Sequence, residues 1–243
     1  MRRRFFVERF EDGSAVVCGE TAEHLGRVLR AEPGQLYELS DGMSVWLARI
    51  ESVALPKRGE SRIEFMLLEP IAAREPRVSL QLLISIVKFE RFEWCLEKAT
   101  ELGANAIVPL AAARSDKPLI EAANKRRARW EKILVESGQQ ARRLRAPALG
   151  EIAGPANAFR TATADCKILL SERPNAPALR EILKPGMDTR SAALAIGPEG
   201  GWNDEEIAAA RTSSFQEASL GENILRTETA VIAAMSVIRF AVG

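Results

Sequence analysis

From residue 78 onward, the chain alternates between uninterrupted apolar runs and segments with helical periodicity, which constrains its fold more than any other feature. The first run, VSLQLLISIV (78–87), has the length and apolar content of a strand that is buried on both faces. The segment that follows ends at Gly103, a typical C-terminal stop for a helix. Its apolar residues fall at helical spacing and predict one buried face: Phe92, Cys95, Leu96, Ala99 and Leu102.

The same alternation continues to the end of the chain. Strands are predicted at 106–110, 167–172, 192–197 and 215–220, and helices at 122–140, 175–184, 204–211 and 225–240. Strands that alternate with helices predict an α/β domain with a mostly parallel sheet, covered on both faces. We assign residues 76–243 to this domain, because the preceding stretch PIAAREPR has the two prolines and alternating charge of a linker.

Residues 1–70 have a different texture, with several short strands and one short helix. Turns are predicted at Asp12-Gly13 and at Asp41-Gly42, each between strand-like pieces, and RIEFMLLE (62–69) adds another strand. The helix in ETAEHLGRVLR has Leu25, Val28 and Leu29 on one side. This pattern predicts a small β-barrel domain.

Composition excludes several classes of protein. A hydrophobic content of 47% is too high for a disordered chain, and a net charge of only +1 means that a nucleic-acid partner requires local basic patches. His24 is the only histidine, which argues against a histidine-based metal site, and we expect no metal. Cys18, Cys95 and Cys166 are too widely spaced for a disulfide framework or a CxxC metal motif, and suit a reducing compartment.

The apolar runs are also too short for insertion into a membrane. None approaches the roughly 18 residues of a spanning helix, and the start MRRRFFVERF has only three apolar residues before Glu8, too few for a signal peptide. We therefore expect a soluble, cytoplasmic protein without a membrane partner.

The turn GPEGG (197–201) joins a predicted strand to a helix whose start carries a capping box, Asn203 with Glu206. The turn lacks the Lys and Ser/Thr of a phosphate-binding loop and is followed by acidic residues, so it suits a neutral or cationic ligand. A simple strand-to-helix connection is equally compatible with it. However, SLGENILRTETA (219–230) repeats the arrangement, and LLSERPN (169–175) follows a third strand. Loops at the carboxyl ends of parallel strands predict a shared ligand site.

These motifs resemble the RsmE family of 16S rRNA uracil-N3 methyltransferases, in the SPOUT superfamily. The likeness covers nearly the whole chain, and it includes HLGRVLR, SDGMSVWLARI, KFERFEWCLEKATELGANAIVPL, RSDKP and RWEKILVESGQQARRLRAPAL. The resemblance implies a PUA-like RNA-binding β-barrel at 1–70 and a SPOUT-type α/β domain at 76–243 with a C-terminal deep trefoil knot. It also implies a homodimer whose active sites lie at the subunit interface.

S-adenosylmethionine is the cofactor that the resemblance implies. The glycines would allow close approach, main-chain groups would bind adenine and ribose, and Glu199 would offset positive charge or only pair with its own helix dipole. The family usually has a basic residue where Glu222-Asn223 stands here, so that side chain is lost. The implied cofactor-binding residues are Leu170, Glu172, Ile196, Gly197, Pro198, Glu199, Gly200, Gly201, Leu220, Gly221, Ile224, Leu225, Arg226 and Thr229.

Uracil N3 bears a proton and becomes a good nucleophile only when that proton leaves. A nearby arginine would stabilise the charge that spreads onto O2 and O4. Arg226 and Arg114 are the candidates, although Arg114 is equally compatible with a surface ion pair. Glu228 or solvent would act as the base, and the sequence does not decide between them.

Local clusters of basic residues point to RNA, either 16S rRNA or the assembled small ribosomal subunit. A solvated helix face is the simpler explanation of the run between 125 and 145. Two alternatives stay open for the function: a ribose 2′-O-methyltransferase, and a non-catalytic RNA-binding ribosome-assembly protein. The candidate RNA-binding residues are Arg2, Arg3, Arg4, Lys88, Arg126, Arg142 and Arg143.

Overall fold

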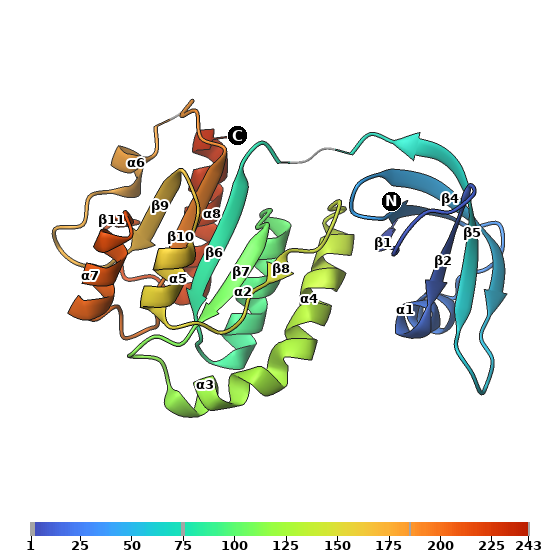
Figure 1. Cartoon of the computed structure of the whole chain (residues 1–243), viewed down its shortest axis with the longest axis horizontal. Helices are drawn as coiled ribbons and strands as arrows, with labels where there is room; N and C mark the ends of the chain where they lie inside the picture. Colours follow the sequence, from blue (N-terminus) through green and yellow to red (C-terminus); the bar gives the residue numbers. More distant parts are fainter. Residues whose placement is uncertain (1–2, 74–75, 185, 243) are drawn as a thin grey trace. The chain divides into compact units, whose positions relative to one another are not determined.

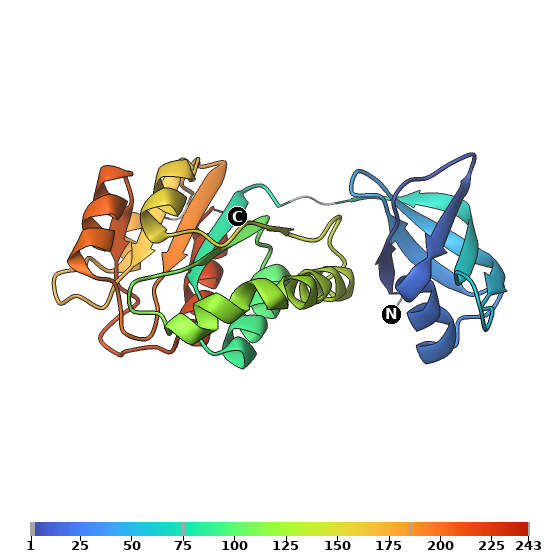
Figure 2. The same ribbon diagram turned by 60° about the horizontal axis from the view of Figure 1, so that its bottom comes forward.

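The computed structural model describes residues 3–73, 76–184 and 186–242 and contains two compact units. The first comprises residues 1–75 together with 138–145, and the second comprises 76–137 and 146–243. The division between 75 and 76 falls within the stretch PIAAREPR (70–77), whereas the grouping of 138–145 with the first unit was not predicted. Figures 1 and 2 show the two units from different sides.

The first unit is built on a five-stranded sheet with the order β1-β3-β4-β5-β2. β1 runs parallel to β3, and the other neighbours are antiparallel. Register shifts between β4 and β5, after Leu47 and after Ile50, mark bulges that bend the sheet. Its elements are β1 (Arg4–Phe6), β2 (Ser14–Cys18), α1 (Gly19–Glu23), η1 (His24–Val28), β3 (Leu36–Ser40), β4 (Val45–Ala54) and β5 (Arg62–Ile71).

Both predicted turns of this unit are present. Asp12 and Gly13 each have a positive φ, as a two-residue hairpin turn requires, and Glu11 bridges to Ser14. Asp41 accepts hydrogen bonds from the main-chain nitrogens of Met43 and Ser44 and thereby closes the turn before β4.

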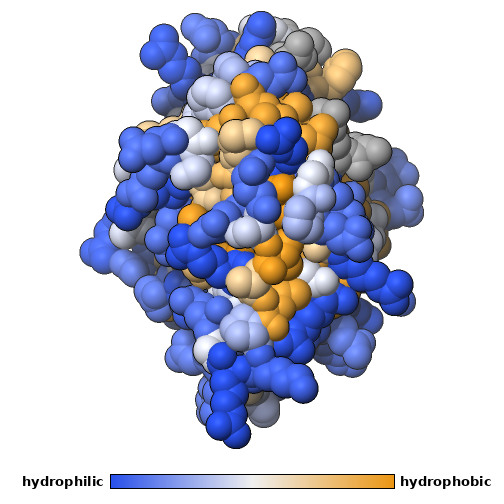
Figure 3. All heavy atoms as spheres, turned by 90° about the vertical axis from the view of Figure 1, so that its right-hand side faces the viewer, coloured by the Kyte–Doolittle hydropathy of each residue, from blue (hydrophilic) through white to orange (hydrophobic). Residues whose placement is uncertain are grey.

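The prediction for the helix in this unit was wrong at one residue. Leu25 is buried and Leu29 packs on the core, but Val28 is 65% exposed. The segment His24–Val28 is a π-helix, in which Leu29 N donates to His24 O, five residues back. The wider turn moves Val28 off the face that α-helical spacing gave it. Figure 3 shows one face of the molecule, on which a patch of apolar surface is surrounded by hydrophilic residues.

The segment 138–145 is held to the first unit by a buried carboxylate, Glu38 of β3. Glu38 is 3% exposed, and it pairs with Arg4 over 2.9 Å and, in closer contact, with Arg142. Arg4 also donates to the main-chain oxygens of Arg142 and Arg143, and Ser40 Oγ donates to Leu144 O over 2.6 Å.

The second unit contains a six-stranded parallel sheet with the order β11-β9-β10-β6-β7-β8, as the alternation of strands and helices predicts. Its elements are β6 (Ser79–Ser85), α2 (Phe89–Glu101), β7 (Ala106–Leu110), α3 (Lys117–Ala123), η2 (Asn124–Arg126), α4 (Arg127–Gln140), β8 (Ala148–Leu149), α5 (Pro155–Thr161), β9 (Cys166–Leu170), α6 (Leu179–Ile182), β10 (Ser191–Ile196), α7 (Asp204–Thr212), β11 (Gln216–Ala218) and α8 (Thr227–Val242).

Helices cover both faces of this sheet, because alternate residues of each strand point to opposite sides. In β10, Leu194 and Ile196 join a core with α2 and α8, while Ala193 and Ala195 join a second core with α5 and α7 (Figure 1). The neighbouring strands β10, β9 and β11 run in the same direction, so the loops that follow them emerge at one edge.

Three features of this unit differ from the sequence prediction. β8 and α5 were not expected, the predicted helix at 122–140 is divided among α3, η2 and α4, and α6 has only four residues. No helix among the described residues combines the length and hydropathy needed to cross a bilayer.

Candidate functional site

The loops after β9, β10 and β11 enclose a pocket of about 700 Å³ in the second unit. The pocket combines apolar side chains with glycine main chain and charged groups, and its size lies within the usual range for small-molecule sites. Its lining residues are Arg91, Arg114, Leu170, Ser171, Glu172, Arg173, Pro174, Ile196, Gly197, Pro198, Glu199, Gly200, Gly201, Trp202, Ile207, Ser219, Leu220, Gly221, Glu222, Asn223, Ile224, Leu225, Arg226, Thr227 and Ala230.

Packing and backbone conformation inside the protein explain why three positions of the GPEGG loop are glycine. A Cβ at Gly197 would lie 3.0 Å from the Trp202 ring, and one at Gly200 would lie 3.2 Å from Arg114 Cβ. Gly201 instead has a φ of +69°, which favours glycine. The expectation that these glycines serve ligand approach is therefore incomplete, since two of them already pack against their own protein.

Hydrogen bonds fix this loop to its neighbours. Trp202 Nε1 donates to Leu170 O over 2.8 Å, joining the loop to the end of β9. Arg114 Nη1 donates to Gly200 O over 2.8 Å, from the loop after β7. The predicted capping box is present, and Glu206 also accepts from Ala113 N over 2.8 Å. The protein itself thus holds the GPEGG loop in place from both sides.

The second glycine loop, 219–226, is more open. Gly221 has a φ of +130°, and Ser219 Oγ lies within hydrogen-bonding distance of its main-chain nitrogen and oxygen. Leu220 and Leu225 pack against the core, whereas Ile224 between them is 80% exposed. Glu222 and Asn223 are exposed at the rim.

Arg91, which no sequence pattern indicated, connects two parts of the site. It lies in the first turn of α2, and its Nη1 pairs closely with Glu199 of the GPEGG loop. Its Nε lies 3.9 Å from Glu228 Oε1, in the first turn of α8. The sequence showed α2 only as a hydrophobic face, and Arg91 stands outside that face.

The structure gives each catalytic candidate a distinct place. Arg226 lines the pocket and is exposed. Arg114 also lines it, but its guanidinium holds the Gly200 carbonyl. Glu228 is not among the lining residues and lies near Arg91 and Cys95; burial and, after it, the Glu228 charge raise the pKa of Cys95 to about 12. The role of Glu228 as a base stays a prediction.

The cofactor candidates gather in the pocket with one exception. Thr229 is exposed and does not line it, while Thr227 is buried and does. Thr227 and Ala230 are three residues apart and share a helical face, and Thr229 lies on another. The lining residues that the prediction missed are Arg91, Ser171, Arg173, Pro174, Trp202, Ile207, Ser219, Glu222, Asn223, Thr227 and Ala230.

The basic candidates do not form one set. Arg2 lies outside the described residues, and Arg3 is exposed. Arg4 is buried against Glu38, so its prediction as a phosphate contact was wrong for the structure as it stands. Burial and then the Arg142 charge lower the pKa of Arg4.

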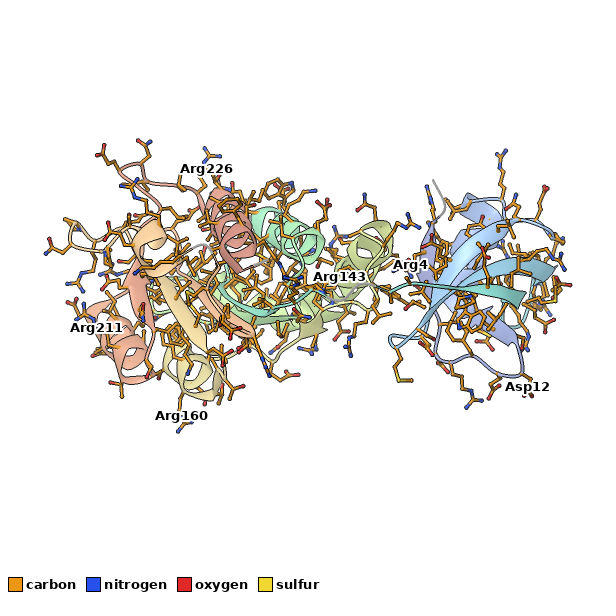
Figure 4. All side chains as sticks on the ribbon, turned by 90° about the horizontal axis from the view of Figure 1, so that it is seen from above. Arg4, Asp12, Arg143, Arg160, Arg211 and Arg226 are labelled. Atoms are coloured by element: carbon orange, nitrogen blue, oxygen red, sulfur yellow. The ribbon has the colours of Figure 1, made fainter. Side chains whose placement is uncertain are left out.

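The remaining basic candidates have different partners. Arg142 also pairs with Glu38, but it is 40% exposed. Figure 4 shows Arg143 near Arg4, which donates to the Arg143 main-chain oxygen over 3.3 Å. In the second unit, Lys88 is exposed at the start of α2, and Arg126 lies over the Phe89 ring at 4.8 Å.

A parallel sheet whose consecutive loops enclose a ligand-sized pocket defines an α/β ligand-binding domain, and residues 74–239 match the family model described as an RNA methyltransferase domain. Proteins named "Ribosomal RNA small subunit methyltransferase E" are similar over nearly the whole chain. The relative from Mesomycoplasma hyopneumoniae is 34% identical over 238 residues, covering 94% of this chain and 95% of the relative. The relative from Synechocystis is 30% identical over 241 residues, covering 94% and 74%. The chain belongs to this ribosomal RNA small subunit methyltransferase E family.

Solved structures agree with this assignment. The chain is 30% identical to the family member from Neisseria gonorrhoeae bound to S-adenosyl methionine, with a TM-score of 0.84 and coverage of 98% of this chain and 97% of that one. A methyltransferase from Legionella pneumophila, in complex with the same cofactor, matches with the same TM-score. The predicted SPOUT-type α/β fold class is confirmed, while the trefoil knot and closed barrel stay predictions.

Proposed function

We propose that this protein is an S-adenosylmethionine-dependent methyltransferase that methylates N3 of a uridine in 16S rRNA. One observation carries the proposal: GPEGG and LGENILRTETA meet in a pocket of about 700 Å³, in a chain 30% identical over nearly its full length to a cofactor-bound relative. We also propose that it acts in the cytoplasm, where ribosomal RNA is processed.

The residues present fit this cofactor. S-adenosylmethionine supplies an electrophilic methyl group on a sulfonium, and Glu172, Glu199 and Glu222 give the pocket the acidic groups that suit a cation. Main-chain groups of the two loops would bind adenine and ribose: those of Ile196, Leu220, Ile224 and Leu225. Glu199 also has a partner other than its own helix dipole, because it pairs with Arg91 of α2.

Arg226 is our candidate for substrate activation. It lines the pocket, and among the described residues it is the lining arginine whose side chain has no hydrogen bond or ion pair. Its guanidinium would stabilise the negative charge on uracil O2 or O4 as the N3 proton leaves. Arg114 would instead position the GPEGG loop through Gly200. We assign the proton to solvent, because Glu228 does not line the pocket.

We further propose a homodimer that forms through α8. One face of this helix packs into the core, while Val237 and Phe240 on another face are 36% and 82% exposed. Ile232 and Ala233, which are half-buried, lie toward the same side of the helix at helical spacing. A second copy would cover these apolar side chains. Light scattering should give a dimer mass for the wild type and a monomer mass for Phe240→Asp.

Basic side chains on both units would contact the RNA phosphates. Lys88 and Arg126 provide charge on the second unit, and Arg3, Arg142 and Arg143 provide it on the first. The partner would be 16S rRNA, free or in the small subunit.

Calorimetric titration with S-adenosylmethionine, followed by methyl transfer to 16S rRNA and to small subunits, tests the proposal. Nucleosides from the product are separated and identified by mass spectrometry. We expect binding and N3-methyluridine. A 2′-O-methyl nucleoside would replace the proposal by the ribose alternative, and absence of cofactor binding at millimolar concentration would replace it by a non-catalytic RNA-binding role.

A further inference from the structure

Arg91 brings three separate parts of the second unit to one point. It stands on α2, its partner Glu199 belongs to the GPEGG loop, and Glu228 begins α8. The Arg91 side chain is 31% exposed, so water screens its interactions only in part. Glu228 is the more buried of the two acids, with a side chain that is 18% exposed.

The other lining arginines have different partners from Arg91. Arg114 donates to a main-chain carbonyl, and Arg173 lies 3.8 Å from Asp204, which does not line the pocket. Among the described residues, Arg91 is therefore the lining arginine found paired with a lining carboxylate. Glu228 Oε2 is buried without a hydrogen-bond partner among these residues, and the other carboxylate oxygen, Oε1, lies 3.9 Å from Arg91 Nε.

We propose that Arg91 sets how strongly the pocket prefers a sulfonium ligand over a neutral thioether. This inference rests on the proposed function. S-adenosylmethionine carries one more positive charge than its product, S-adenosylhomocysteine, and the two otherwise differ by a methyl group. By neutralising Glu199 and Glu228 in part, Arg91 reduces the attraction of the wall for that extra charge and keeps the two affinities closer together. It is a specificity residue and takes no part in the chemical step.

The test measures the dissociation constants of both ligands by calorimetry on the full chain. The quantity compared between variants is the dissociation constant of S-adenosylhomocysteine divided by that of S-adenosylmethionine. The ratio cancels losses that affect both ligands equally, such as a displaced loop. Arg91→Gln should raise the ratio by about 3- to 10-fold, because Glu199 and Glu228 lose their cation. Glu199→Gln should lower it by a similar factor, and the double variant should return it toward the wild-type value.

Arg91→Lys keeps the charge and should leave the ratio within about twofold of the wild type. Arg129→Gln is the matched control. Arg129 of α4 pairs over 2.8 Å with Glu93, which lies on α2 as Arg91 does, and Arg129 does not line the pocket. The effect of Arg91→Gln should shrink when salt rises from about 0.05 M to about 0.5 M.

A ratio that stays constant in Arg91→Gln, with both ligands weakened equally, would overturn the inference and leave Arg91 a purely structural role. If the wild type binds neither ligand, the proposed function fails instead. The two failures are therefore distinguishable.

Discussion

The indole Nε1 of Trp202 donates a hydrogen bond to the main-chain oxygen of Leu170 over 2.8 Å, which joins the GPEGG loop to the end of β9. The same indole lies against Gly197, where an added Cβ would be 3.0 Å from the ring. One side chain therefore connects the loop after β10 to the end of β9. The same side chain leaves no room for a Cβ at position 197.

Gly197→Ala should lower the free energy of unfolding by about 1–3 kcal/mol, because the new methyl group overlaps the indole. Trp202→Phe should cost about 1–3 kcal/mol through the lost hydrogen bond to a buried carbonyl. The smaller Phe ring leaves room for the methyl group, so the double variant should lose less than the sum of the two. Urea denaturation of the four proteins measures this coupling, and strict additivity would show that Gly197 and Trp202 are not in conflict.

Glu38→Gln should destabilise the first unit by about 3–5 kcal/mol, because it removes the carboxylate that pairs with Arg4 and Arg142 in a buried site. Glu51→Gln is the matched control on the neighbouring strand, where Glu51 is 47% exposed and pairs with Arg49. Its expected cost is below about 1 kcal/mol. Equal losses in urea denaturation would show that the buried position of Glu38 has no energetic consequence.

Cys95 should resist alkylation in the folded protein. Burial and the Glu228 charge raise its pKa from 9.0 to about 12, so the thiol stays protonated at about pH 8, where thiolates react. Iodoacetamide followed by peptide mass spectrometry should modify the exposed Cys18 and leave Cys95 intact. Because the folded pKa is raised, the linked stability is fully present below pH 9.0 and is lost as pH approaches 12. Rapid labelling of Cys95 would contradict its burial.

Arg226→Ala should lower the single-turnover rate about 10²- to 10³-fold, with cofactor affinity changed far less, because its charge is needed when the N3 proton leaves. Arg160→Ala is a suitable control: Arg160 donates to Asn157 within α5, and Figure 4 shows it on the opposite side of the second unit. An unchanged rate would remove Arg226 from the mechanism.

The basic candidates should separate into two groups. Lys88→Ala and Arg3→Ala should each reduce the salt dependence of RNA binding, a slope change of about 0.7–0.9 for each lost phosphate contact, at unchanged stability. Arg4→Ala should instead lower the melting temperature, since Arg4 is buried with Glu38. Filter binding across a salt series, with thermal melts, distinguishes the groups. A stable Arg4→Ala protein with a reduced slope would restore Arg4 as an RNA contact.

Much of the α/β unit was predictable from the sequence, because its strands are long enough to show their apolar content. β6 and α2 are examples, since the helical spacing of Phe92, Leu96 and Ala99 matches the buried face. α5 was missed because a helix of seven residues spans less than two turns and shows no clear period. The exposure of Val28 depends on a π-helix, which hydrophobic spacing does not reveal.

The site was predictable where main chain forms it. Glycine turns after strands mark two walls of the pocket, and the residues that the family resemblance implied for the cofactor line this pocket, except Thr229. Arg91 was not predictable in this way, because its role depends on Glu199, 108 positions away, and on the packing of α2 beside α8. The burial of Arg4 likewise depends on Glu38, 34 positions away, whereas an N-terminal run of arginines resembles a surface cluster.

The most direct test of the central claim is mass mapping of 16S rRNA from cells that lack the gene, with and without its restoration. The account predicts that one N3-methyluridine disappears in the deletion strain and returns with the wild-type gene, but not with Arg226→Ala. A modification map that is identical in the deletion and parent strains would contradict it.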